Sequence, residues 1–65
     1  MFQIKNIVED EIIFSSSTQN DFICKVNSIA IENEDTDINI KSTFDAISYL
    51  REYCSNLIFL SKENV

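Results

Sequence analysis

The stretch YLREYCSNLIFL, residues 49–60, is the most apolar part of a short and acidic chain. When the residues from Phe44 onward are placed at about 100° per residue, the apolar ones gather in one arc of a helix surface. The residues in this arc are Tyr49, Leu60, Tyr53, Ala46, Leu57, Leu50, Cys54, Ile47, Ile58 and Phe44. Arg51 and Ser61 interrupt the arc, and Phe59 is the one apolar residue outside it. This sorting predicts a continuous helix over about residues 43–61.

The sequence contains a clear signal for the start of this helix but none for its end. Ser42 with Asp45 three residues later fits a capping box, in which side chains satisfy the free N–H groups at a helix start. An alternative interpretation ends the helix near Cys54 and makes NLIFL, residues 56–60, a final strand, which its Ile and Phe content favours. Because no Gly or Pro enforces a stop before residue 56, the continuous helix is preferred and the strand is kept as the alternative.

The first forty residues alternate short apolar runs with polar clusters that are typical of turns. The turn clusters are EDE at 9–11, SSTQND at 16–21 and ENEDTD at 32–37. The apolar runs are FQIKNIV at 2–8, EIIFSS at 11–16, DFICKVNSIAIE at 21–32 and DINIK at 37–41. Their period-two patterning and β-branched residues predict strands. In the third run the phase shifts between Val26 and Ile29, which requires a bulge or a strand break near Asn27–Ser28.

These patterns together predict an α+β fold. We expect one small domain over residues 1–65, with an antiparallel meander of three to four strands within residues 2–41, followed by one C-terminal helix packed on the sheet. A chain of 65 residues buries only about 60% of the surface that its unfolded form exposes. Chains of this size commonly gain stability from disulfides, a bound metal or oligomerisation, and oligomerisation is the one of these that the sequence favours, so a homo-oligomer is expected.

Composition excludes several classes of function. Eleven acidic residues against five basic ones give a net charge of −6, which opposes direct binding to a phosphate backbone. The N-terminal segment lacks the features of a signal peptide, and no apolar run is long enough to span a membrane. We therefore expect a cytoplasmic protein whose two cysteines, Cys24 and Cys54, are buried free thiols, with a disulfide between them as the alternative.

The candidate chemical sites are weak. Activation of a thiolate needs a nearby cation or histidine; there is no histidine, and both cysteines lie on predicted apolar faces, so no catalytic residue is predicted. The ENEDTD cluster places Asn33, Asp35 and Asp37 like the first ligands of a calcium loop. However, Ile38 stands where that loop needs Gly and Phe44 where it needs Glu. We expect no enzyme, no cofactor and no metal, with weak binding of a divalent cation as an alternative.

The surplus width of the apolar arc predicts the function. A helix on a sheet needs an apolar stripe of only about 100°, so the flank with Tyr49, Tyr53 and Leu60, and next to them Phe59, is expected to contact a partner. The acidic turns would form a rim that attracts a basic partner. The residues of this acidic rim are Glu9, Asp10, Glu11, Glu32, Glu34, Asp35 and Asp37.

The favoured hypothesis is therefore a non-catalytic protein-interaction module. It would be a small acidic accessory or inhibitory protein that binds another protein or homodimerises through the helix flank. A second hypothesis is an acidic mimic of DNA that inhibits a DNA-binding protein, since the eleven acidic side chains could imitate duplex phosphates.

Overall fold

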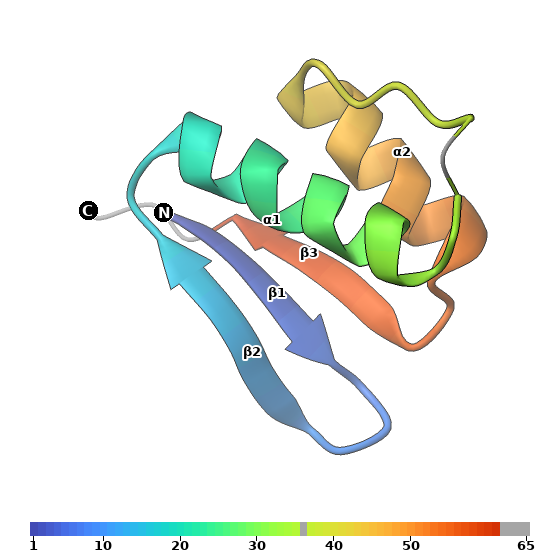
Figure 1. Cartoon of the computed structure of the whole chain (residues 1–65). Coiled ribbons are helices and arrows are strands. Elements are labelled where there is room, and N and C mark those ends of the chain that lie inside the picture. The colour runs from blue at the N-terminus through green and yellow to red at the C-terminus, as the bar shows by residue number, and fades with distance from the viewer. Residues whose placement is uncertain (36, 62–65) are drawn as a thin grey trace.

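The computed structural model describes residues 1–35 and 37–61 and has the order strand, strand, helix, helix, strand (Figure 1). The elements are β1 (Phe2–Asn6), β2 (Glu11–Ser16), α1 (Gln19–Glu32), α2 (Thr43–Tyr53) and β3 (Leu57–Ser61). The prediction of an α+β fold with a small antiparallel sheet is confirmed. The prediction of a single C-terminal helix is wrong, because the described chain contains two helices.

The sheet has three strands in the order β2-β1-β3, and both pairs are antiparallel. The first strand is therefore central, and the last strand returns to pair with it, which is not the predicted meander. Ile4 lies opposite Phe14 on one side and Phe59 on the other. The next residue of β1, Lys5, lies opposite Ile12, so Ile13 is an extra residue that forms a β-bulge.

The segment that was predicted as a third strand is α1. Its buried residues Phe22, Val26, Ile29 and Ala30 follow the spacing of one helix face rather than the alternation of a strand. The helix begins at the N-cap Thr18, whose hydroxyl accepts a hydrogen bond of 3.4 Å from the backbone N–H of Asp21. Residues 37–41, which were also predicted as a strand, lie in the connection between the two helices.

The prediction of a helix over residues 43–61 is also wrong, and the alternative with a final strand describes the chain. The predicted start is correct, since the Ser42 hydroxyl accepts a 3.1 Å hydrogen bond from the Asp45 N–H. The helix ends at Tyr53. β3 then pairs along the whole of β1, and the Asn56 carbonyl accepts a further 2.9 Å bond from the Ile7 N–H. Backbone pairing with the open side of β1 outweighs the helical pattern of the sequence.

The end of α1 is a Schellman motif in a chain that contains no glycine. The Asp35 N–H donates to the Ala30 carbonyl at 2.9 Å, and the Glu34 N–H donates to the Ile31 carbonyl at 3.0 Å. Glu34 takes the left-handed conformation, with φ of 62°, that glycine most often supplies. This turn reverses the chain and brings Asp35 next to α2.

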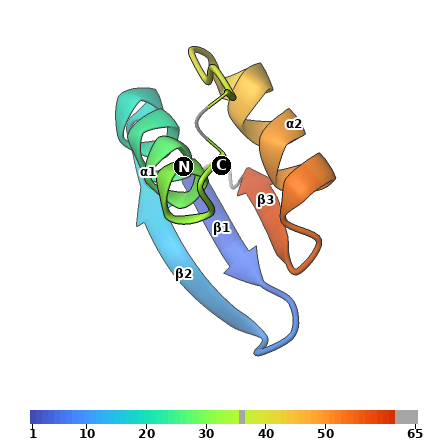
Figure 2. The same cartoon turned by 45° about the vertical axis from the view of Figure 1, so that its right-hand side comes forward.

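Both helices cover the same face of the sheet, and the core lies between the helices and the sheet (Figures 1 and 2). Phe22 of α1 is fully buried, with its ring centroid 5.6 Å from Phe2 and 5.0 Å from Phe59. The buried core residues are Ile4, Phe22, Val26, Ile29, Ala30, Ile40, Ala46, Tyr49, Leu50 and Cys54. Neither of the two described helices has the length and the apolar character that a membrane span requires.

Candidate functional site

The four residues predicted to contact a partner do not form one surface. Tyr49 is only 2% exposed, whereas Tyr53 is 53% exposed with its ring stacked 5.0 Å from that of Tyr49. Phe59 packs against the core, and Leu60, the next residue of β3, therefore points to the opposite face of the sheet. The physical reason is α1, because a second helix buries the flank of α2 that the sequence pattern left exposed.

Tyr49 is the centre of a hydrogen-bond network between the end of α1 and α2. Its hydroxyl donates to Oδ2 of Asp35 at 2.7 Å and accepts from Nδ2 of Asn33 at 3.2 Å. The same Asn33 amide contacts Sγ of Cys54 at 3.8 Å. Burial, followed by the hydrogen bond to Asp35, raises the pKa of Tyr49 to about 12, and burial also raises the pKa of the Cys54 thiol. Both groups are therefore protonated at neutral pH and hold the two helices together.

This network predicts a loss of stability at high pH. Because the pKa of Tyr49 rises from its ordinary value of 10.0 to about 12 on folding, the folded chain keeps a proton that the unfolded chain releases. The free energy of unfolding should be unaffected by this group below pH 10 and should fall as the pH rises from about 10 to about 12. In the Tyr53→Phe variant, Tyr49 is the only phenol, so its absorbance titration reports this group alone. An equal pKa with and without denaturant would contradict the prediction.

The two cysteines differ in their surroundings. Both are free thiols, but Cys24 is exposed, contrary to the prediction that it is buried. A strand would place Cys24 on the same face as Phe22 and Val26, whereas a helix turns it about 200° away from Phe22. Among the described residues, no group of three or more Cys, Asp or Glu side chains is arranged to hold a metal ion.

The acidic rim gathers at one end of the molecule. Residues 9–11 lie at the β1–β2 turn, and Glu32, Glu34, Asp35 and Asp37 lie at or after the end of α1. In Figure 1 the β1–β2 turn and the end of α1 lie on the side of the molecule where β3 begins. Only one ion pair is formed within the described part of the chain, between Nζ of Lys5 and Oδ1 of Asp10 at 2.7 Å, and its hydrogen bond holds the pKa of Asp10 below the usual value.

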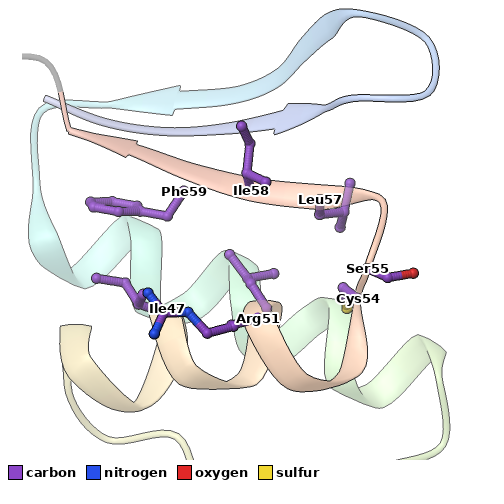
Figure 3. Close-up of a pocket in the computed structure, with 8 residues that line it drawn as sticks. Ile47, Arg51, Cys54, Ser55, Leu57, Ile58 and Phe59 are labelled. Atoms are coloured by element: carbon purple, nitrogen blue, oxygen red, sulfur yellow. The ribbon is translucent and has the colours of Figure 1, made fainter.

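A groove of about 290 Å³ runs between α2 and β3 (Figure 3). Ile47 and Arg51 of α2 form one wall, and Leu57 and Phe59 of β3 form the other. The Arg51 side chain extends along the helix toward Ile47, whereas Ile58 points away from the helix. Arg51 is exposed, and no described carboxylate lies within ion-pair distance of it. The groove is therefore mostly apolar and carries one cation, which has no carboxylate partner among residues 1–35 and 37–61.

The outer side of β3 adds backbone hydrogen-bonding groups to this groove. The Ile7 N–H to Asn56 carbonyl bond continues the register of the ladder, so the peptide groups of Ile58 and Leu60 point toward β1. By alternation, those of Phe59 and Ser61 point away from it. Because β3 is an edge of the sheet, no strand of the described chain pairs with this side. An open edge of this kind is a template for a further strand.

Comparison of the chain with protein-family models, with curated proteins and with solved structures finds no match. The geometry of the groove and of the open edge is therefore the basis for a functional proposal. Sequence reasoning missed this site, although it contained two signals. Arg51 interrupted the apolar arc, and Phe59 fell outside it, as expected for a residue whose neighbours alternate in a strand.

Proposed function

We propose that the chain is a non-catalytic protein-interaction module that binds an extended segment of another protein along the outer side of β3. The observation that carries this proposal is the open edge of β3 beside an apolar groove. In strand addition, backbone hydrogen bonds supply affinity, and pockets for alternate side chains supply specificity. Phe59 and Ser61 offer the backbone groups, and the groove under α2 offers such a pocket.

The size of the groove favours a peptide over a small metabolite. Its volume of about 290 Å³ is just below the roughly 300–1,000 Å³ of small-molecule pockets, and one side of it is open. This space fits one or two side chains of a longer segment. An accessory or inhibitory role is consistent with this mode, because a segment that is bound along β3 is withheld from its other interactions.

The acidic rim supplies a preference for the charge of the partner. β3 begins at the end of the sheet where the rim lies, so the part of a bound segment next to Leu57 is close to these carboxylates (Figure 1). Acidic side chains at this place speed the approach of a basic partner and would favour Lys or Arg at that end of the segment. Homodimerisation through the helix flank is not part of this proposal, because Tyr49 is buried and Leu60 lies on the other face of the sheet.

Selection of peptides from a random phage-displayed library on the immobilised chain tests this function. The expected binders shift the NMR amide signals of β3 and protect the Phe59 and Ser61 amides from hydrogen exchange. Ser61→Pro removes one outward N–H and should weaken binding by about 2- to 12-fold, since one hydrogen bond contributes about 0.5–1.5 kcal/mol.

The matched control is Ser61→Ala, which removes the hydroxyl and keeps the N–H, and which should bind as the natural chain does. Circular dichroism of both variants checks that the sheet is retained. The proposal is wrong if the selected peptides map to β2 or to the uncovered face of the sheet, or if Ser61→Pro binds them as well as Ser61→Ala does.

A further inference from the structure

The position of α2 limits what can occupy the open edge. The α2 backbone comes close to α1 and to β3 and does not reach β1. Figure 2 shows α2 on the β3 side of the molecule, beyond the middle of the sheet. Because a helix with its side chains is about 10–12 Å wide, and neighbouring strands are only about 4.8 Å apart, α2 overhangs the edge of β3. The groove lies beneath this overhang (Figure 3).

A second copy of the chain does not fit this edge. Two-fold pairing of β3 with its counterpart along the strand would put both α2 helices on the same face of one continuous sheet. Their axes would then be about 5 Å apart, because each lies over its own β3, whereas packed helices need about 8–10 Å. A net charge of −6 on each chain adds repulsion. The edge therefore suits a strand that carries no helix of its own on that side.

We infer that the occupant is a bare extended segment in which an Asp or Glu pairs with Arg51 and an apolar side chain fills the groove. This inference rests on the proposed function and specifies its partner. Arg51 is exposed and has no carboxylate partner in the described chain, so a carboxylate from the segment would complement it. Guanidinium and carboxylate form paired, charge-assisted hydrogen bonds that fix orientation as well as affinity.

The ladder sets the spacing of the two side chains. A residue opposite Phe59 points to the same side of the sheet as Phe59 does, toward the groove, and so does the residue two positions away, near Leu57. Arg51 lines the same groove, and its side chain extends along α2 toward Ile47 (Figure 3). The segment therefore has an acidic and an apolar residue separated by one residue, with the intervening side chain on the uncovered face.

The test uses the peptides from the library selection, each compared with its own analogue in which the acidic residue is replaced by its amide. On the natural chain we expect the amide analogue to bind about tenfold more weakly, as for a hydrogen bond to a charged group. On the Arg51→Gln variant both peptides should bind equally. Lys25→Gln, which removes a cation from α1 instead of the groove, should keep the tenfold difference.

The outcomes separate this inference from the proposed function. Peptides that map to β3 with no difference between acid and amide overturn the inference and leave strand addition in place. Peptides that map elsewhere overturn the proposed function itself.

Light scattering over a dilution series measures the oligomeric state of the natural chain, for which we expect a monomer. A dimer that Ser61→Pro dissociates and Ser61→Ala does not would identify a second copy as the occupant and overturn the inference.

Discussion

Phe22→Ala is expected to lower the free energy of unfolding by about 3–5 kcal/mol. The Phe22 side chain is fully buried, and its ring forms a three-ring cluster with those of Phe2 and Phe59. It therefore connects α1 to both the first and the last strand. Small domains have total stabilities toward the lower end of about 5–15 kcal/mol, so this one substitution should remove most of the stability of the chain.

Urea denaturation followed by far-ultraviolet circular dichroism measures this loss. The matched control is Phe44→Ala, because Phe44 is 68% exposed at the start of α2. Its effect should stay within about 0.5 kcal/mol. Equal losses for the two variants would mean that α1 does not pack on the sheet through Phe22.

The same residue explains how far the sequence could predict α1. Phe22 and Val26 share a face in a strand and in a helix, so the first half of the segment does not distinguish the two. Ile29 does distinguish them, because it is three residues after Val26 and fits only the helix. In a strand, that phase shift requires a bulge or a strand break, which is the prediction made from the sequence. Thr18 followed by Asp21 was a further helix-start signal inside a segment that was assigned to a turn.

β3 could not be predicted from local periodicity for a different reason. Residues 57–60 follow the apolar arc of α2 when they are placed on a helix, with the single exception of Phe59. What makes them a strand is the open side of β1, about fifty residues earlier in the chain. Pairing over such a distance leaves no periodic signal in the segment itself. The capping of α2 by Ser42 is local, and it was predicted correctly.

The candidate site depended on both of these elements. Without α1, nothing buries Tyr49, and the exposed flank of one helix is the natural prediction. Without β3, there is no edge strand and no groove beside Arg51. The residues of the acidic rim could be predicted without α1 or β3, because turns can be recognised from their residue types. The position of the rim next to β3 could not be predicted. Surfaces made by one element were therefore predictable, and surfaces shared by two were not.

Tyr49→Asp and Tyr53→Asp, two changes of the same kind four residues apart on α2, should have opposite outcomes. Tyr49→Asp puts a charge in a 2% exposed site next to the Asp35 carboxylate. It should lower the free energy of unfolding by about 3–5 kcal/mol. Tyr53→Asp puts the charge on a half-exposed site. It should cost only about 0.5–1.5 kcal/mol, mainly the stacking of the two rings.

Chemical denaturation of both variants tests this contrast, and Tyr49→Phe provides an intermediate. It keeps the ring and removes the hydroxyl that joins Asn33 to Asp35, so it should cost about 1–2 kcal/mol. Unfolding of Tyr53→Asp, with Tyr49→Asp tolerated, would reverse the assignment of core and surface on α2.

The contrast also bears on function. Tyr53 does not line the groove between α2 and β3, so the folded Tyr53→Asp chain should bind the selected peptides as the natural chain does. A loss of peptide binding in this folded variant would instead place the interaction on the side of α2 that faces away from β3. That result would restore the tyrosine surface that the sequence predicted, with Tyr53 as its exposed member and Tyr49 supporting it from the core.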